Sequence, residues 1–313
     1  MVLLRRLAYR LHLLGIERAG IPLIVVGNLS VGGTGKTPLV LWLVERLCEA
    51  GYAPGIVSRG YGSAAAGAHQ PREVGVKDDA ALCGDEPVLL ARRGGCPVWI
   101  GADRVAAARA LLAAHPQCNV IVSDDGLQHY RLARDAEVAV IDGARGHGNG
   151  FLLPAGPLRE PPSRLGTVDA VVVRGADARS AAAAVTAVPQ FTLSLEAGPF
   201  YNLLNPQHTD NAHRFNGQRV HAVAGIGNPE HFFNTLKELG LTFTAHPFPD
   251  HHPYAQADLA FEDCDVVVMT EKDAVKYERH ATEKYWALDV TAQVENRLAA
   301  LLIERMKIAQ RKP

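Results

Sequence analysis

The sequence IPLIVVGNLSVGGTGKTP, from Ile21 to Pro38, decides the fold of this chain. It opens with an apolar, β-branched run from Ile21 to Val26, which is typical of a buried parallel strand. A glycine-rich turn and a Lys-Thr pair come next. They lead into a predicted helix that has Pro38 in its first turn and Gly51 just past its end. A strand, a glycine-rich turn, a lysine and a helix in this order predict a phosphate-binding loop.

The predicted loop would bind nucleotide phosphates through its backbone and two side chains. Lys36 would reach the β and γ oxygens, and the Thr37 hydroxyl would hold Mg²⁺. Ser30 stands where the general pattern G-x-x-x-x-G-K-[ST] has its first glycine, so a glycine-rich turn that binds nothing is the alternative. The predicted nucleotide-binding residues are Ser30, Val31, Gly32, Gly33, Thr34, Gly35, Lys36 and Thr37.

The composition limits the classes of protein that fit. A chain of 313 residues is long enough for two domains, and 48% hydrophobic with 21% charged residues is an ordinary globular balance. The formal net charge of −1 gives no general attraction to nucleic acid, so we expect no such partner. The five cysteines are dispersed without a C-x-x-C pair, which favours reduced thiols in the cytoplasm and argues against a zinc site.

The first 17 residues, Met1 to Glu17, predict an amphipathic helix. Its leucines share one helical face and its arginines are interspersed, which suits a helix lying on an anionic membrane surface. A helix packed on its own domain is the alternative, and the sequence does not decide between the two. There is neither a signal peptide nor an apolar run long enough to cross a bilayer, so we expect any attachment to be peripheral.

Two acidic pairs follow the phosphate loop in the chain. Asp124 and Asp125 come directly after an apolar strand, Asn119 to Ser123. At the carboxyl end of a strand beside a phosphate loop, a carboxylate meets Mg²⁺ directly or through water. A solvated turn is the alternative for this pair. Asp85 and Glu86 stand at the start of a predicted helix, where acidic residues also act as simple caps.

Seven stretches of the chain resemble, in order, the lipid A 4′-kinases (tetraacyldisaccharide 4′-kinases), and together they cover nearly its whole length. They are Gly27 to Pro38, Ser58 to Gly62, Gly84 to Pro87, Asp124 to His129, Leu153 to Glu160, Phe248 to His251 and Thr270 to Lys276. The resemblance implies a kinase that uses ATP and Mg²⁺ to phosphorylate the 4′-hydroxyl of an acylated glucosamine disaccharide, the lipid precursor of lipid A. It also implies action at the cytoplasmic face of the inner membrane, with no protein partner.

The resemblance further implies roles for individual residues. Asp85 would be the base that takes the acceptor's proton, assisted by His251. Lys36 and Mg²⁺ would neutralise the charge of the transferring phosphoryl group. Thr37 and the Asp124/Asp125 pair would hold that metal, and Glu160 would complete the metal site. The side chains expected near the substrate are Arg59, Arg104, Gln128, His129 and Arg159, although a solvated surface position is the default reading for Arg59.

We expect an α/β fold in two domains, with the active site in the crevice between them. A P-loop domain with a mostly parallel sheet would cover residues 1–188. A β-hairpin and linker would cover residues 189–217, the hairpin being two short strands split by Glu196-Ala-Gly-Pro199. A smaller α/β domain would cover residues 218–313.

Two motifs of the smaller domain bear on other functions. The adjacent residues His251 and His252 point in different directions and lack a third ligand at suitable spacing, which disfavours a metal site. The word Thr270-Glu-Lys-Asp273 after a strand can cradle a nucleotide base, and it would also fit a P-loop GTPase of the metallochaperone or switch type. A kinase of a soluble metabolite is the other alternative, for which Met1 to Glu17 would be only structural.

Overall fold

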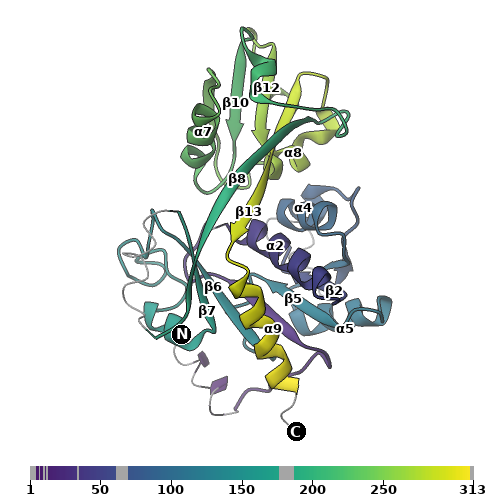
Figure 1. The fold of residues 1–313 in the computed structure, drawn as a ribbon, viewed down its shortest axis with the longest axis vertical. Coiled ribbons are helices and arrows are strands. Elements are labelled where there is room, and N and C mark those ends of the chain that lie inside the picture. The colour runs from purple at the N-terminus through teal and green to yellow at the C-terminus, as the bar shows by residue number, and fades with distance from the viewer. Residues whose placement is uncertain are drawn as a thin grey trace.

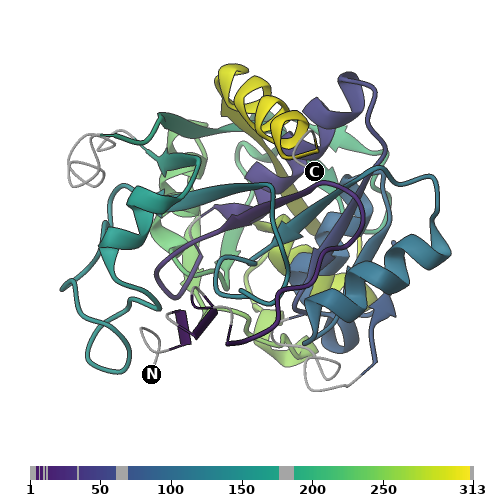
Figure 2. The ribbon, with the colours of Figure 1, turned by 90° about the horizontal axis from the view of Figure 1, so that it is seen from below.

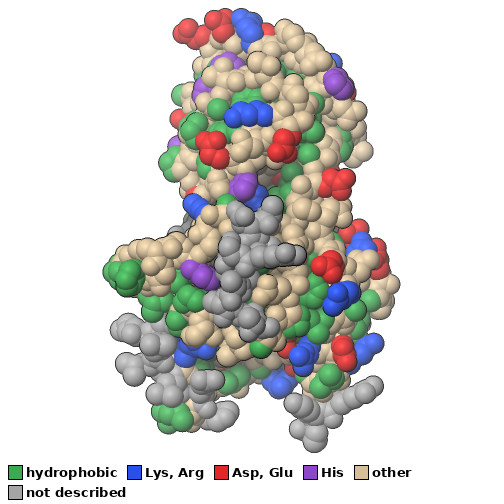
Figure 3. Space-filling view, turned by 60° about the vertical axis from the view of Figure 1, so that its left-hand side comes forward, with side chains coloured by type: hydrophobic (Ala, Val, Ile, Leu, Met, Phe, Trp, Pro, Cys, Tyr) green, Lys and Arg blue, Asp and Glu red, His purple; other side chains and the backbone are tan. Residues whose placement is uncertain are grey.

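The computed structural model describes residues 5–6, 8–9, 11, 13–33, 35–60, 70–175 and 187–310. This part of the chain forms two lobes, a broader and a narrower one, joined at a waist (Figures 1 and 3). A single sheet runs through both lobes in the order β11-β10-β12-β13-β8-β7-β6-β1-β5-β2-β4-β3, and β9 pairs with β8. The α/β class with a mostly parallel sheet is confirmed.

Most neighbouring strands run parallel. The antiparallel pairs are β8 with β13, β8 with β9, and β3 with β4. The strands are β1 (Leu23–Gly27), β2 (Pro54–Ser58), β3 (Arg72–Glu73), β4 (Val98–Ile100), β5 (Val120–Asp124), β6 (Ala136–Asp142), β7 (Ala170–Arg174), β8 (Gln190–Asn202), β9 (Thr209–Asp210), β10 (Val220–Ala224), β11 (Thr244–Pro247), β12 (Val266–Thr270) and β13 (Tyr285–Val294). The α-helices are α2 (Lys36–Glu49), α3 (Ala80–Cys83), α4 (Asp85–Arg93), α5 (Arg104–Ala114), α7 (Pro229–Glu238), α8 (Glu271–Tyr277) and α9 (Arg297–Gln310).

Strand β1 lies at the centre of the larger lobe's sheet, between β5 and β6. Its side chains alternate between two cores. Ile24 and Val26 pack in the core that α2, α4 and α9 cover, and Leu23 and Val25 pack in the core that α5 covers. Figure 2 shows α9 and α5 on opposite faces of the sheet. Because β1 is buried on both faces, it needs an apolar side chain at every position, which explains the uninterrupted run in the sequence.

The two lobes are joined by a ribbon of β8 and β13, and this corrects the predicted hairpin. Strand β8 runs without a turn for 13 residues, pairing with β7 at its start and antiparallel with β13 along most of its length. At the predicted turn, Gly198 and Pro199 stand opposite the single residue Asp289, where the register shifts. Two residues facing one are a β-bulge, which bends a strand and tolerates glycine and proline. The Gly-Pro pair therefore marks a bend between the lobes.

The last helix, α9, lies in the larger lobe, although residues 218–313 were predicted to form the smaller domain. Its buried residues Leu298, Leu302 and Met306 belong to the core that contains α2 and one face of β1. The chain returns to the larger lobe along β13 before this helix begins (Figure 1). An amphipathic helix is stabilised by whichever apolar face it reaches, and the sequence of α9 does not specify which lobe offers that face.

The N-terminal segment is described only in part. Residues 5–6 and 8–9 are helical, whereas the predicted apolar face at Leu3, Leu4 and Leu7 lies outside the described residues. Large apolar side chains are exposed just after it, at Leu11 (58%), Leu13 (74%), Leu14 (41%) and Ile16 (46%). Within the described ranges, no helix is long and apolar enough to span a membrane.

Candidate active site

The phosphate loop connects β1 to α2, as predicted. Gly32 and Gly35 have φ angles of 96° and 88°, which glycine adopts without steric cost. Gly35 is the N-cap residue of α2 and forms no side-chain cap, so the first N–H groups of the helix are left for another acceptor. Backbone donors at a helix N-terminus are the usual site for a bound phosphate.

The first residues of the loop are held by the segment that contains Pro157 and Leu158. The Val31 N–H donates to the Pro157 carbonyl at 2.9 Å, and Ser30 forms a bridge with Leu158. These contacts explain how Ser30 replaces the usual glycine, since a strand-like pairing fixes this end of the loop. Thr34 lies outside the described residues.

Lys36 begins α2 and is buried, with 9% of its side chain exposed. Its Nζ lies 3.2 Å from Oδ1 of Asn28 and 3.3 Å from Oδ1 of Asp125. Asn28 precedes the loop and was not among the predicted site residues, although it stands in the stretch that resembles the lipid kinases. The two acceptors position the ammonium group at the start of α2, where the phosphates of a nucleotide would bind.

Asp125 is bound by two cations. Nη1 of Arg159 lies 2.9 and 2.8 Å from its two carboxylate oxygens, in addition to the contact with Lys36. Burial acts to raise the pKa of Asp125, but Lys36 and Arg159 outweigh it and lower the pKa to about 2. Gln128 joins this group through its Oε1, 3.4 Å from Arg159 Nη1. The predicted residues 125, 128 and 159 are thus brought together.

Asp124 has a different environment from its neighbour. Its Oδ2 accepts from the Ser58 hydroxyl at 2.9 Å, whereas its buried Oδ1 has no hydrogen-bond partner. Burial, with the charge of Glu86, raises the pKa of Asp124 to about 7 in spite of Lys36. A buried carboxylate oxygen without a donor fits a site for Mg²⁺ or its bound water, together with the Thr37 hydroxyl. The described residues hold no cluster of three or more His, Cys, Asp or Glu side chains suited to a metal.

Asp85 and His251 form a pair between the lobes, although 166 positions separate them in the sequence. Nδ1 of His251 lies 3.0 and 2.9 Å from the two oxygens of Asp85, which is 4% exposed at the start of α4. The hydrogen bond with Asp85 raises the pKa of His251. Burial acts to raise the pKa of Asp85, but His251, Lys272 and Lys276 together lower it. The pair therefore contains a carboxylate that stays ionised and a histidine that readily takes a proton.

Backbone strain points to the same residues. In the described part of the chain, the non-glycine residues with positive φ are Asp125, at 51°, and His251, at 60°. A left-handed conformation of such a residue costs on the order of 1–3 kcal/mol and is concentrated at functional sites. His251 is held by its N–H, which donates to the Gly225 carbonyl at 3.2 Å.

Two lysines of α8 complete the surroundings of Asp85, and the sequence did not single them out as site residues. Nζ of Lys272 lies 3.1 Å from Glu86, 3.2 Å from Asp250 and 3.9 Å from Asp85. Nζ of Lys276 lies 4.0 Å from Asp85. Four residues apart on one helix, the two lysines face the same direction. The signal in the sequence was the spacing of four residues between the two lysines in the helix that directly follows β12.

Asp273 of the word Thr270-Glu-Lys-Asp273 has a structural role, and a contact of this word with a nucleotide base stays a prediction. Asp273 is fully buried and accepts hydrogen bonds from the Gly225 N–H at 3.0 Å and the Thr270 hydroxyl at 2.6 Å. Its other oxygen accepts from the Tyr254 hydroxyl at 3.1 Å and pairs with Lys276 at 2.8 Å. Both carboxylate oxygens are therefore occupied by the protein, and they fix the loop that carries His251.

The neighbouring histidine, His252, points elsewhere, as expected. Its Nε2 lies 3.1 Å from Asp258, so it takes no part in the Asp85 pair.

Of the remaining residues expected near the substrate, Arg104 is close enough to Asp125 and Asp124 to interact with their charges. Arg104 is 3% exposed and donates to the Gly101 carbonyl at 2.7 Å. Burial lowers its pKa to about 10 against the attraction of Asp125 and Asp124. Burial and Arg104 lower the pKa of His129 to about 4, so that this ring is neutral. Arg59 is exposed at the end of β2.

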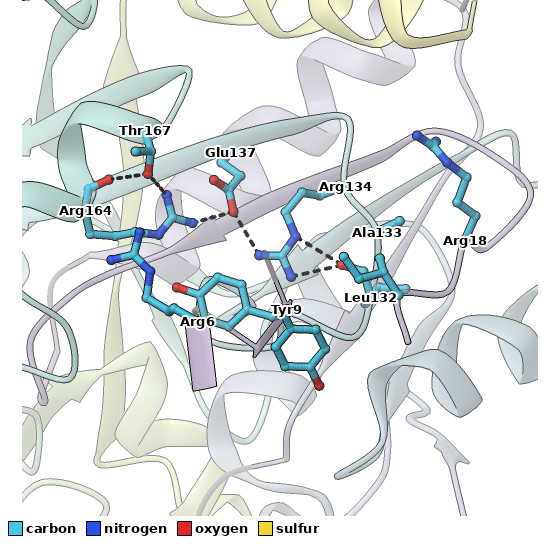
Figure 4. A pocket seen from close by; sticks show the side chains of 11 residues that line it. Arg6, Tyr9, Arg18, Leu132, Ala133, Arg134, Glu137, Arg164 and Thr167 are labelled. Atoms are coloured by element: carbon cyan, nitrogen blue, oxygen red, sulfur yellow. Dashed lines mark hydrogen bonds and ion pairs between the residues drawn. The ribbon is translucent and has the colours of Figure 1, made fainter. Parts of the chain in front are cut away.

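The partners of Glu160, Tyr130 and Arg164, line a second pocket of about 430 Å³, which Figure 4 shows. The fully buried carboxylate of Glu160 accepts from the Tyr130 hydroxyl and lies 3.3 Å from Nε of Arg164. Arg164 and Arg134 both donate to Glu137, at 2.6 and 2.8 Å (Figure 4). These contacts give Glu160 partners within the protein, and its role as a metal ligand stays a prediction.

A cleft of about 430 Å³ lies between the lobes and joins the parts of the site. It is lined by the phosphate loop and the start of α2, by Glu86 next to the catalytic candidate Asp85, and by Lys272 from α8. The end of β7, the middle parts of β8 and β13, and the helix α7 contribute further lining residues. A nucleotide whose phosphates lie on α2 would thus occupy a space that leads to the Asp85–His251 pair.

The fold and this geometry are those of a P-loop phosphotransferase that acts on a hydroxyl group. The family model described as Tetraacyldisaccharide-1-P 4′-kinase matches residues 1–307. The chain belongs to this family of kinases. The two alternative functions considered from the sequence, a GTPase switch and a kinase of a soluble metabolite, are not favoured.

Known proteins of the family are similar over nearly the whole chain. The tetraacyldisaccharide 4′-kinase of Methylobacillus flagellatus is 48% identical over 98% of this chain and 88% of its own. The enzyme of the same name from Aromatoleum aromaticum is 51% identical over 96% of this chain and 88% of its own. Among solved structures, LpxK from Aquifex aeolicus in complex with ATP has a TM-score of 0.81 at 28% identity and covers 97% of this chain and 95% of its own.

Proposed function

We propose that this chain transfers the γ-phosphoryl group of ATP to the 4′-hydroxyl of an acylated glucosamine disaccharide 1-phosphate, the step named by its relatives. The observation that carries the proposal is the Asp85–His251 pair, built across the lobes beside the cleft that begins at the phosphate loop. A kinase of a hydroxyl group needs both parts, a phosphate site and a base within reach of it.

The phosphate site neutralises charge. The N–H groups at the start of α2 and the Lys36 ammonium bind the phosphates, because they converge on the same side of the loop. Mg²⁺, held by the Thr37 hydroxyl and the free oxygen of Asp124, would supply further positive charge to the phosphoryl oxygens. Asp125 is already neutralised by Lys36 and Arg159, so its part is to orient these two cations.

The Asp85–His251 pair removes the acceptor's proton. The Asp85 carboxylate accepts that proton as the oxygen attacks the γ-phosphorus, while His251 holds the carboxylate through Nδ1. His251 donates its Nδ1–H to the carboxylate, so the two groups titrate as a coupled pair, with the pKa of Asp85 lowered and that of His251 raised. Lys272 and Lys276 keep Asp85 ionised before the reaction.

Attachment to a membrane surface is part of the proposal. The exposed residues Leu11, Leu13, Leu14 and Ile16 form an apolar stretch that follows an arginine-containing segment. Two further apolar side chains, Phe151 (63%) and Leu153 (52%), are exposed on the loop that leads to Arg159. Exposed apolar residues near basic ones suit the interface of an anionic bilayer, where a substrate with acyl chains is held.

The direct test is incubation with γ-labelled ATP, Mg²⁺ and a lipid A disaccharide precursor in mixed micelles. Label should appear in the lipid with the full chain and not with Asp85→Asn. The matched control, His252→Ala, should transfer label normally because His252 pairs with Asp258 outside the site. Hydrolysis of ATP without labelled lipid, or transfer to a soluble sugar alone, would refute the assignment.

A further inference from the structure

Two arginines from neighbouring strands lie against the glycines of the phosphate loop. A side chain placed on Gly35 would come within 3.0 Å of Cδ and 3.8 Å of Nε of Arg174, at the end of β7. A side chain on Gly32 would come within 3.1 Å of Nη1 of Arg145, which follows β6. Because Gly32 and Gly35 have no Cβ atom, the two arginine side chains can lie against the loop. The same glycines adopt the positive φ angles.

Arg174 faces the cleft without an acceptor of its own. It lines the cleft together with Gly35, Lys36 and Thr37. Arg104 and Arg159 have acceptors at 2.7 and 2.8 Å, but within the described residues the guanidinium of Arg174 forms no hydrogen bond or ion pair. Burial lowers the pKa of Arg174, which expresses the cost of holding its charge there, and Asp142 only partly offsets this.

Asp142, at the end of β6, is placed to hold this arginine. It is 3% exposed, and its Oδ1 accepts from the N–H groups of Ala144 and Arg145 at 3.1 and 3.3 Å. Its Oδ2 has no hydrogen-bond partner and lies 4.0 Å from Nε2 of His231, on α7 of the smaller lobe. Burial and the charge of Arg174 lower the pKa of His231, so the ring is neutral. The negative charge of Asp142 is therefore balanced by the arginines and not by His231.

We propose that Arg174 is a phosphate-binding residue of the nucleotide site and that Asp142 positions its guanidinium. The inference rests on the proposed use of ATP and names a second protein cation, besides Lys36, that meets the bound phosphates. An anion that accepts from the N–H groups of Gly35 and Lys36 lies next to the α-carbon against which Arg174 packs. The bound phosphate supplies the acceptor that this partly buried guanidinium lacks among the described residues.

The test is calorimetric titration with ATP and, separately, with inorganic tripolyphosphate, which has no base or ribose. Arg174→Met should weaken both by the same factor, roughly ten- to hundredfold, the range of a charge-assisted hydrogen bond. Arg174→Lys keeps the charge but loses the planar fork, so it should lose less. Arg305→Met is the matched control, because Arg305 pairs with Asp169 at 3.2 Å and does not line the cleft.

The positioning role of Asp142 has its own readout. Asp142→Asn should weaken tripolyphosphate binding, and the double variant Asp142→Asn/Arg174→Met should bind no more weakly than Arg174→Met alone. Independent, multiplicative losses would overturn the positioning role. A loss for ATP without a loss for tripolyphosphate would mean a contact to the base or ribose, and no loss for either would remove Arg174 from the site. If the unmodified chain fails to bind ATP at all, the proposed function fails instead.

Discussion

Replacing the two members of the Asp85–His251 pair tests the mechanism most directly. After His251→Ala, Asp85 still accepts from the Glu86 N–H at 2.8 Å and keeps Lys272 and Lys276 at 3.9 and 4.0 Å. It stays in place and ionised, so kcat should fall to the low end of the range for general-base assistance, about hundredfold. Asp85→Asn removes the proton acceptor itself, and we expect the upper end, about ten-thousandfold. The double variant should be hardly worse than Asp85→Asn, because members of one catalytic unit are not additive.

The stability that the Asp85–His251 pair contributes depends on pH with opposite signs for its two members. The hydrogen bond with Asp85 raises the pKa of His251 above its ordinary value of about 6.5. The stability that protonated His251 gains from the pair is therefore complete below pH 6.5 or so and is lost as the pH rises through the raised pKa. Asp85 has the opposite sign: its pKa is lowered, so its contribution is present above its ordinary range and is lost only as the pH falls through the lowered value.

Catalysis should follow the protonation of His251. A cationic His251 makes the Asp85 carboxylate a weaker base than a neutral ring does, so kcat of the unmodified chain should decline on the acid side below the raised pKa of His251. In His251→Ala this acid limb should move to lower pH, where Asp85 itself becomes protonated. Initial rates of label transfer to the lipid, at saturating ATP and across the acid and neutral range, measure both limbs. His252→Ala should leave the profile unchanged, and an unmoved acid limb in His251→Ala would refute the coupled pair.

Three further predictions concern the phosphate loop, the N-terminal segment and the buried aspartate of α8. Lys36→Ala should raise the activation free energy for kcat by roughly 3–4 kcal/mol with little change in thermal stability. Near-normal turnover with bound Mg-ATP would exclude this loop from catalysis. Serine at Leu11, Leu13 and Leu14 should release the chain from anionic vesicles in a sedimentation assay, since these leucines are exposed; a lower melting temperature with unchanged binding would favour a helix packed on its own lobe. Asp273→Asn should reduce the free energy of urea unfolding by about 3–5 kcal/mol because it removes the nearest carboxylate of the buried Lys276, whereas a changed preference between ATP and GTP at normal stability would mean a contact to the base.

The centre of the larger lobe could be predicted because its signals are local. The apolar run of β1, the glycines of the loop and the helical spacing of α2 lie within one continuous stretch, and each element is stabilised by its nearest neighbours. Asp124 followed from the same logic, as a carboxylate at the end of the strand beside β1. The pairing of Asp85 with His251 came from the resemblance to the lipid kinases, since spacing alone does not bring residues 166 positions apart together.

Other features depend on contacts that no local pattern contains. Gly198 and Pro199 are residue types typical of turns, and it is their pairing opposite Asp289 on β13 that makes them a bulge. Asp273 stands in a sequence word typical of base-binding sites, and only its four partners in the structure show that its oxygens are occupied. In both cases the local propensity was interpreted correctly, and a residue distant in the sequence decided the outcome.

The two halves of the site differ in how the fold supports them. The phosphate site is built within the larger lobe, where Lys36, Asp125 and Arg159 hold one another. The proton-accepting pair exists only across the lobes, because His251 comes from a loop that Asp273 fixes in the smaller lobe. Binding of phosphate therefore does not require the smaller lobe to be well ordered, whereas removal of the acceptor's proton does. The pair therefore depends on the contacts between the lobes, which include the ribbon of β8 and β13 and the ion pair of Lys272 on α8 with Glu86 on α4.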